Sequence, residues 1–529
     1  MNAHLVAVPI LLPLVVGAIM LLVARRRRWL ELGLSIGSAL AVMASALALM
    51  AAADGSAGVI DRVYRVGDWP APVAIVLVAD RLAGLMVLLA SILALANVVF
   101  ALSRWASLGP YYHPLSQFLL MGLNGAFLTG DLFNLFVFFE VLLAASYGLL
   151  LHGSGRKRVT TGLHYIIINL IASLFILIGV SAIFGVTGTL KMSVLAELVP
   201  TLPDDTRRLF HAGAAILGVA FLVKAAAWPL GFWLPRTYDA AVPPASAMFA
   251  IMTKLGIYAL IRLSLLILGA DGGASSHAAL IWLIAIGAGT MLMALIGMLA
   301  ARDVGRLGGY NLLLSAGTLL GAVGLGDAAV TAGALFYLFV STLGAAILFL
   351  IAGLLAAERG DEFEDEPLLE KYDPEGEDPY EEYDERPLEV PAPIGLLGAA
   401  FLLCTLLIAG IPPLPGFIAK FAMLEPLIGA SAGAPPPGAM LMTVLLILSS
   451  FVALFTLIRA GMRIWWVDPG RVPPTVRLAE IAPLFALLGI ALILTIAVDR
   501  PVRFMERTAA ELHNPADYLE TVFGRSADR

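Results

Sequence analysis

The sequence predicts an all-α integral membrane protein with about fourteen transmembrane helices, and three observations lead to that prediction. Of the 529 residues, 60% are hydrophobic and 14% are charged, whereas soluble domains average about 25% charged residues. Apolar stretches of about twenty residues, enough to cross a bilayer core of roughly 30 Å, recur along the whole chain. The polar linkers expected between several soluble cores do not appear. The composition therefore excludes a soluble enzyme, a disordered chain, a secreted disulfide scaffold and a nucleic-acid binder.

Each apolar stretch is interpreted as one helix. The first could be mistaken for a signal peptide, but it lacks a basic start and a small-residue cleavage site, so we expect it to be a span. Proline removes a backbone donor, so we expect breaks in the seventh helix, at Pro229, and in the twelfth, at Pro412, Pro413 and Pro415. The expected helices are 5–24, 30–53, 82–103, 115–130, 132–151, 162–188, 210–235, 243–264, 278–299, 305–325, 329–356, 393–430, 439–465 and 480–498.

The two broken helices resemble each other. WPLGFWLP at 228–235 and PPLPGFIAK at 412–420 lie five spans apart, and a lysine stands beside each break. This similarity suggests that helices four to eight and nine to thirteen are two repeats. Repeats with an odd number of spans have inverted topology, a common transporter design with sites at mid-membrane. The expected domains are 1–114 (helices one to three), 115–264 (first repeat), 278–357 with 391–466 (second repeat), and 478–529 (helix fourteen and an outer tail).

The basic residues indicate the orientation in the membrane. One set of alternate loops holds eighteen of the 33 Lys and Arg residues and the other holds twelve, five of them in the tail after residue 499. Cytoplasmic loops carry the excess, so both termini are expected on the outer side. The stretch 358–389 alone carries −13, against −6 for the whole chain. We expect 358–390 to be a flexible, solvated cytoplasmic loop. A cation-collecting role for this loop is the alternative.

Four charged residues lie in mid-span, where a charge is expensive and is by default a sign of function. Glu140 follows Asp131 by nine residues, so it lies roughly 13 Å along its helix. Lys224 precedes Pro229 by five residues, and the backbone loosened by the proline can solvate its ammonium. A Glu140–Lys224 pair that forms and separates would be a proton switch. The alternatives are an acid paired for structure and a lysine that snorkels to the interface.

The other mid-span charges are Lys254, eleven residues into its helix, and Lys420, just after the second break. Glu425 lies five residues after Lys420 and nearer the outer surface, so it is a possible exit-side acid. His164 lies near the cytoplasmic end of helix six and could be an entry relay. A histidine satisfied by its own helix is the alternative for His164.

No cofactor or metal site is expected. The only cysteine, Cys404, lies in an apolar run, and one thiol builds neither a disulfide nor a Cys-ligated metal site. No ATP-binding loop, metal motif or catalytic triad is visible. The sequence therefore favours a transporter over an enzyme.

At this point the motifs resemble a known family. The segments 130–150, 224–260, 336–355 and 410–421 are similar to the antiporter-like proton-channel subunits of Mrp-type cation/proton antiporters and of respiratory NADH–quinone oxidoreductase. They are most similar to the D subunits of Mrp-type antiporters. The resemblance implies an inverted-repeat helical fold with a hydrated polar axis. It also implies that Glu140 is the essential helix-five glutamate, Lys224 its partner, Lys254 the connecting lysine and Lys420 the terminal lysine.

One departure from the family concerns the link between the two repeats. Before Ser341, Thr342 and Leu343, related D subunits commonly have a histidine where this chain has Val340. A titratable link is therefore missing, and water, Tyr337, Ser341 or Thr342 could bridge in its place.

The sequence as a whole predicts a proton-relaying subunit of a sodium- or potassium-proton antiporter in a bacterial inner membrane, assembled with other subunits. Three lysines on one path would repel a hard cation that needs several oxygen ligands, so we expect the cation to cross in a partner subunit. Two alternatives stay open. One is a proton-pumping subunit of an NADH–quinone oxidoreductase or a membrane hydrogenase, and the other is an assembly scaffold that transports nothing.

Overall fold

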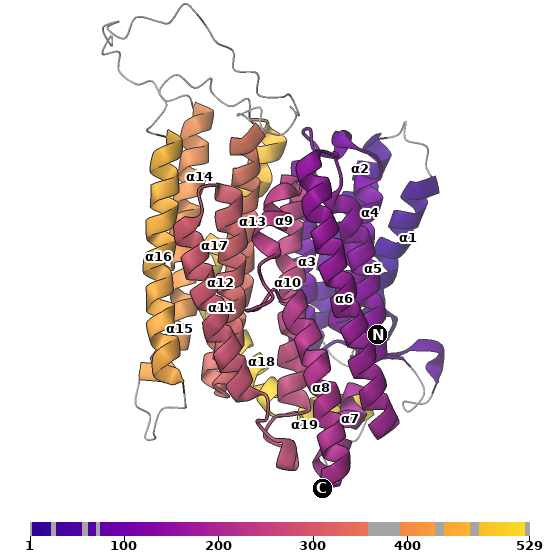
Figure 1. Ribbon diagram of the computed structural model, residues 1–529. Coiled ribbons are helices and arrows are strands. Elements are labelled where there is room, and N and C mark those ends of the chain that lie inside the picture. Colours follow the sequence, from indigo (N-terminus) through magenta and orange to yellow (C-terminus); the bar gives the residue numbers. More distant parts are fainter. Residues whose placement is uncertain are drawn as a thin grey trace, which may run out of the picture.

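The structure, a computed structural model, describes residues 3–22, 28–55, 62–69, 75–357, 392–428, 438–465 and 476–523. The long helices of these segments run side by side as a bundle (Figure 1). They are α1 (Val8–Leu22), α2 (Arg28–Ala53), α3 (Arg81–Ala101), α4 (Tyr112–Leu128), α5 (Leu132–Leu150), α6 (Arg156–Thr187), α8 (Asp204–Lys224), α10 (Pro243–Leu266), α11 (Leu280–Ala300), α12 (Val304–Gly324), α13 (Ala328–Ala357), α14 (Ala392–Ala409), α15 (Pro415–Ile428), α16 (Ala439–Trp465) and α17 (Leu478–Ile496).

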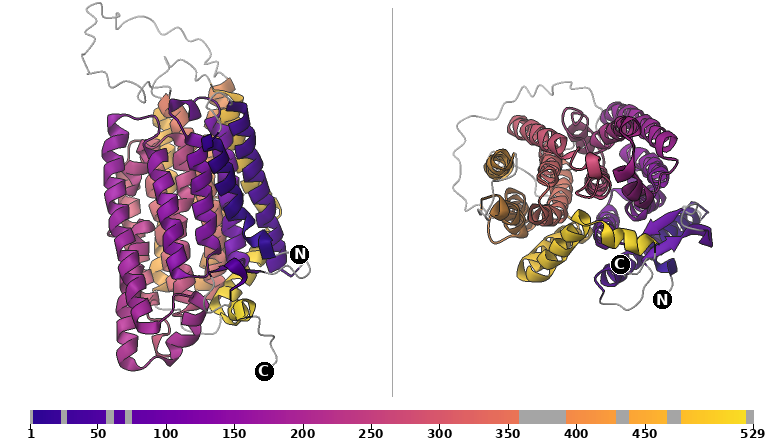
Figure 2. Two further views of the ribbon diagram at one scale, coloured as in Figure 1. Left: turned by 90° about the vertical axis from the view of Figure 1, so that its right-hand side faces the viewer. Right: turned by 90° about the horizontal axis from the view of Figure 1, so that it is seen from below.

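Shorter elements lie around the bundle. The helices α7 (Met192–Leu198), α9 (Leu234–Ala240), α18 (Asp499–His513) and α19 (Ala516–Phe523) were not expected as separate elements. A two-stranded antiparallel sheet pairs β1 (Val63–Arg65) with β2 (Val76–Val78). The start of α1 and the helices α18 and α19 lie toward the lower end of the bundle, and α13 ends at the upper end (Figures 1 and 2).

The predicted all-α membrane fold is confirmed. Eleven helices of the described segments are long and apolar enough to cross a membrane, and every one of the fourteen expected ranges contains a helix. The number of spans itself stays a prediction. The predicted break in helix seven is present, because α8 ends at Lys224 and α9 starts at Leu234, but α8 starts at Asp204 instead of residue 210. The expected acidic loop 358–390 lies outside the described residues.

The order of the long helices within the two expected repeats is the same. The segment from α4 to α10 contains three long helices, the short α7, a broken helix (α8 and α9) and a final helix. The segment from α11 to α16 contains three helices, a broken helix (α14 and α15) and a final helix. In both, the third helix packs against the broken one: α6 against α8 and α9, and α13 against α14 and α15. This matching order is what the inverted-repeat prediction requires.

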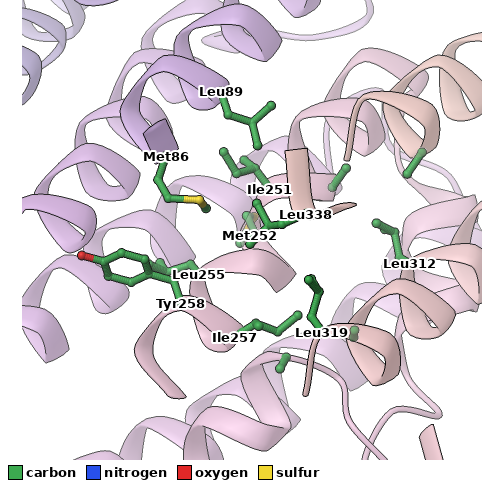
Figure 3. Packing of buried hydrophobic residues seen from close by; sticks show 14 of the residues in the cluster. Met86, Leu89, Ile251, Met252, Leu255, Ile257, Tyr258, Leu312, Leu319 and Leu338 are labelled. Atoms are coloured by element: carbon green, nitrogen blue, oxygen red, sulfur yellow. The ribbon is translucent and has the colours of Figure 1, made fainter. Parts of the chain in front are cut away.

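The centre of the bundle is formed by α10, α12 and α13, which are buried along almost their whole length. Leu255 and Ile251 of α10 pack toward Met86 and Leu89 of α3, and Leu338 of α13 lies nearby (Figure 3). Helices that are apolar all round belong inside a bundle. The buried polar side chains of these three helices therefore have only protein around them.

A buried carboxylate attaches the last long helix to the body of the bundle. Glu480, in the first turn of α17, has no exposed surface. It accepts hydrogen bonds from the Ser103 hydroxyl at 2.6 Å, from Arg104 Nε at 2.8 Å and from the Arg477 backbone N–H at 3.0 Å. These bonds join α17 to the end of α3, and α17 packs along α3.

We expect Glu480→Gln to lower the free energy of unfolding by about 1–3 kcal/mol, because Arg104 then loses its buried charge partner. Thermal or denaturant unfolding in detergent measures the change. The control is Asp499→Asn, which removes an acid paired with Arg503 where both side chains are more than 60% exposed. Exposed pairs contribute less than about 1 kcal/mol, and an equal loss in both variants would contradict the assigned role of Glu480.

Candidate functional site

The three predicted lysines are all buried. Lys224, Lys254 and Lys420 are 5%, 0% and 4% exposed. Each ammonium donates a hydrogen bond to a serine hydroxyl on a neighbouring helix, so the structure contains three polar centres. Charged groups inside a membrane protein need such partners because hydrocarbon offers none.

The first centre joins α5, α6 and α8. Lys224 Nζ donates to Ser173 Oγ at 2.9 Å and to the Asn169 carbonyl at 3.4 Å. The Ser173 hydroxyl in turn donates to the Glu140 carboxylate. Glu140 and Lys224 are therefore brought together as predicted, with Ser173 between them. Phe139 covers the centre, because its ring centroid lies 5.4 Å from Lys224 Nζ.

Lys224 is the last residue of α8, and the proline downstream accounts for this. Proline at 229 cannot donate a backbone hydrogen bond and would clash with the carbonyl of residue 225 in a helix, so the chain leaves the helix before it. Ala226 takes a positive φ of 53°, and the Trp228 N–H donates to Thr290 Oγ1 of α11 at 2.8 Å. The N–H groups of Ala225, Ala226 and Ala227 pair with carbonyls of the last turn of α8, and the Lys224 ammonium reaches across to α6.

Asp131 positions the helix that carries Glu140. Its carboxylate accepts hydrogen bonds from the Phe133 and Asn134 N–H groups at 2.9 Å and so caps the start of α5. Burial raises the pKa of the Asp131 carboxyl above its ordinary value, while these two donors favour the ionised form. Capping of this kind fixes the first turn of a helix.

The second centre joins α10, α12 and α13. Lys254 Nζ donates to Ser315 Oγ, and Ser315 shares a hydrogen bond with Ser341 at 2.8 Å. The Tyr337 hydroxyl interacts with Ser315 and Thr318. Predicted residues Lys254, Tyr337 and Ser341 thus come together. Thr342 does not join them, because its hydroxyl donates to the Leu338 carbonyl of its own helix at 2.6 Å.

The third centre lies at the second break. Lys420 Nζ, on α15, donates to Ser450 at 2.8 Å, to Ser449 at 3.3 Å and to the Ala409 carbonyl at 3.2 Å. Ala409 is the last residue of α14. The Lys420 ammonium therefore lies against the carbonyl end of a half-helix, whereas the carbonyl that contacts Lys224 lies within α6, and the two lysines occupy opposite sides of their breaks.

Two of the predicted secondary residues lie away from these centres. His164 is exposed on α6, and its Nδ1 is 2.8 Å from the Thr160 carbonyl one turn earlier. Glu425 is exposed on α15. Val340, which stands where related D subunits commonly have a histidine, is 2% exposed and next to Ser341.

The three centres are not joined to one another by hydrogen-bonded side chains in the described part of the chain. Between Ser341 and Lys420 the packing is close. A Cβ added to Gly344 of α13 would lie 3.1 Å from Ile408 Cγ1 of α14, and Cys404 Sγ is 3.4 Å from the Gly344 carbonyl. A proton that moves between the centres therefore needs water or side-chain movement.

The serines are the site residues that sequence reasoning missed. On α6, Tyr165, Asn169 and Ser173 are spaced by four residues and all are buried. Residues at this spacing share one helix face. A polar row of this kind in an otherwise apolar helix was a usable signal for Ser173. Ser315 likewise lies four residues after Asn311 and three before Thr318, all of them buried on α12, whereas Ser449 and Ser450 have no such neighbours. The described residues contain no group of three or more His, Cys, Asp or Glu that could hold a metal.

Comparison with known proteins agrees with this geometry. The model of the NADH:quinone oxidoreductase/Mrp antiporter transmembrane family matches residues 129–456, more than half of the chain. The chain belongs to this family. It is 47% identical to the D subunit of a probable K(+)/H(+) antiporter of Rhizobium meliloti, over 98% of this chain and 97% of that protein. It is 31% identical to the D subunit of a Na(+)/H(+) antiporter of Bacillus subtilis, over 98% and 99%.

A solved structure is also similar. A chain of the Mrp complex from Dietzia sp. DQ12-45-1b superposes with a TM-score of 0.83 at 26% identity, and the match covers 99% of this chain and 100% of that one. The matched family region begins just before α5 and ends within α16, so it contains all three polar centres.

We expect Gly410→Ala to destabilise the protein by about 1–2 kcal/mol. Gly410 has a φ of 73°, which costs a residue with a Cβ, and the added Cβ would lie 2.9 Å from Lys420 Cδ. Gly395→Ala is the control, because nothing lies within 4 Å of its Cβ position in α14. Unfolding in detergent should show a loss only for residue 410. Equal stability of the two variants would contradict the close approach at the break.

Proposed function

We propose that this chain is the proton-translocating subunit of a multi-subunit antiporter that exchanges Na+ or K+ for protons, and that it is not an enzyme. The observation that carries the proposal is the set of three buried lysines on serine hydroxyls, one of them linked through its serine to the half-buried Glu140. The names of the Rhizobium and Bacillus relatives support the exchange of a monovalent cation for protons.

The first centre provides a short route for one proton. The Ser173 hydroxyl gives its proton to the Glu140 carboxylate and takes one from the Lys224 ammonium. The carboxylate and ammonium become a carboxylic acid and an amine, the serine is regenerated, and the net charge of the centre stays zero. Water stabilises an ion pair more than it stabilises the corresponding neutral pair. A change in hydration would therefore move the proton in either direction.

Electrostatics would couple this centre to the next lysine. Two unit charges 4 Å apart interact by about 4 kcal/mol at an intermediate effective dielectric constant, and the energy falls with distance. Loss of the charge on Lys224 would lower the repulsion on Lys254, which could then receive a proton. The same step would follow between Lys254 and Lys420. His164 is proposed as an entry relay, Tyr337, Ser341 and Thr342 as bridging groups, and Glu425 as an exit-side acid.

The cation is proposed to cross elsewhere in the complex. Sodium and potassium are bound by several oxygen ligands, and a nearby ammonium repels them. Each centre here contains a lysine, and among the described residues only the first has a carboxylate in hydrogen-bond contact. A partner subunit would then supply the cation route. The similar solved structure is named as an Mrp complex, which supports assembly of this chain with partner subunits.

The proposed location is a bacterial inner membrane, with both termini on the outer side. The upper end of the bundle in Figure 1 would then face the cytoplasm. Arg104, Arg302 and Arg463, at the ends of α3, α11 and α16, support this orientation.

A second candidate follows from the family description, which also includes NADH:quinone oxidoreductase. In such a complex the same three centres would pump protons that a redox partner drives. Neither type of subunit holds the redox centre, so gene neighbours separate the two functions. Genes for other small antiporter subunits support the first, and genes for iron–sulfur and quinone-site subunits support the second.

We expect Glu140→Gln and Lys224→Met each to lower cation-driven proton movement at least tenfold, since each removes one end of the transfer. Everted membrane vesicles with a pH-sensitive dye give the measurement, and immunodetection of the assembled complex controls for folding. Glu506→Gln, an exposed acid on α18, is the matched control. Full exchange in both variants would mean that the buried charges serve assembly alone.

Ser173 provides a finer test of the transfer. We expect Ser173→Ala to lower exchange severalfold, because no other described side chain hydrogen-bonds both Glu140 and Lys224, and we expect Ser173→Thr to retain most of it. Ser181→Ala, at an exposed position on the same helix, should change nothing. If Ala and Thr variants are equally active, the hydroxyl does not carry the proton.

A further inference from the structure

Three arginines gather at the upper end of the bundle, away from the polar centres. Arg302 lies between α11 and α12, and Arg459 and Arg463 lie near the end of α16. Together with the last residues of α11 they line a cavity of about 290 Å³. No carboxylate of the described residues lies within 4 Å of any of them.

The helix geometry explains why two of the arginines point there. Arg459 and Arg463 are four residues apart, so they share one face of α16. Arg459 Nη2 donates to the Leu299 carbonyl at 2.7 Å and to the Ala301 carbonyl at 3.3 Å, and Arg463 Nη2 donates to the Arg302 carbonyl at 3.1 Å. These acceptors are the free carbonyls at the end of α11, which attract cations.

These bonds leave most of the donors free. A guanidinium has five N–H groups, and the contacts above use one nitrogen of each arginine. Arg459 Nε is buried and has no hydrogen-bond partner, and the Arg302 side chain has no partner within the described segments. The cavity therefore holds three positive charges with unused donors. Capping of the C-terminus of α11 explains the positions of Arg459 and Arg463 but not that of the Arg302 side chain.

Several other cations at this end of the bundle have carboxylate partners. Lys157 Nζ lies 3.1 Å from an Asp239 carboxylate oxygen, and Arg306 lies near both Asp239 and Asp303. Arg104 contacts Glu480 at 2.8 Å. These pairs distinguish Lys157, Arg306 and Arg104 from the three arginines between α11 and α16.

An exposed apolar face continues from the cavity toward the middle of the bundle. The helices α11 and α16 pack against each other. Leu292, Ile296 and Leu299 of α11 share one face and are 44–69% exposed. On α16 the exposed apolar side chains are Phe451, Phe455, Ile458 and Met462. The Arg459 guanidinium lies 5.6 Å from the Phe455 ring centroid, so charge and apolar surface are contiguous.

We propose that this face binds an anionic phospholipid, with its phosphate in the arginine cavity and its acyl chains along α11 and α16. Guanidinium groups bind phosphate through two parallel hydrogen bonds, and basic cavities between transmembrane helices bind such headgroups. Free phosphate would leave the apolar face uncovered. An acidic protein partner would need carboxylates at the arginine cavity and a long apolar surface along α11 and α16. A phospholipid has an anionic headgroup followed by apolar chains in one molecule.

The test is native mass spectrometry of the full-length chain in mild detergent, titrated with cardiolipin and with phosphatidylcholine of the same acyl chains. We expect cardiolipin to bind more tightly. Each arginine near an anionic headgroup should change the affinity about fivefold. Arg302→Gln should therefore weaken cardiolipin binding about fivefold, and the triple variant with Arg459→Gln and Arg463→Gln about a hundredfold. Phosphatidylcholine binding should not change.

The matched control is Arg306→Gln, which removes a charge from the same end but has acidic neighbours. Arg302→Gln keeps the test meaningful if the triple variant does not fold, because no hydrogen bond of its side chain is lost. Equal cardiolipin affinity for the unaltered chain and Arg302→Gln would overturn the proposal. Displacement of the lipid by inorganic phosphate would also overturn the proposal. Loss of partner subunits from the complex in the arginine variants, while the lipid stays bound, would overturn it too.

Discussion

A buried ammonium must be solvated by protein when it lies inside a membrane, and this requirement shapes the whole site. Here serine hydroxyls and backbone carbonyls do the solvating. Lys224 contacts Ser173 and the Asn169 carbonyl, and Lys420 contacts Ser449, Ser450 and the Ala409 carbonyl. Neutral hydroxyls stabilise a charge less than a carboxylate does. Each buried ammonium is therefore solvated mainly by neutral groups.

The breaks in the two half-helix pairs serve the same requirement. The mid-helix carbonyls of an uninterrupted helix already accept backbone hydrogen bonds, so a break adds acceptors for a mid-membrane cation. The prolines at 229 and 412–415 end α8 and α14 inside the bundle. In the first break the lysine is the last helical residue, and in the second it reaches back from α15 past Gly410. The second break thus supplies a carbonyl to its lysine, whereas the carbonyl that contacts Lys224 belongs to α6.

The charged residues and the breaks were predictable from sequence, whereas their partners were not. A Glu or Lys inside twenty apolar residues is a local signal, and so is a proline. Serine is common in membrane spans, and its role depends on which helix faces it, which is a tertiary property. The helix α18 carries many charges, so the sequence predicts a tail there rather than a helix. Glu480 was placed at a helix start, and only the structure relates it to Arg104 across more than 370 residues of sequence.

The centres differ in a way that affects how a proton can travel. The first has an acid and an amine joined by a hydroxyl, so a proton can move within it while the total charge stays zero. Among the described residues, the second and third have no acid in hydrogen-bond contact, so their charge must change whenever a proton arrives or leaves. A buried change of charge is costly unless a neighbouring charge changes with it. Lys254 and Lys420 would therefore each gain a proton only when the preceding centre has lost one. Close packing around Gly344 would keep the two proton transfers separate.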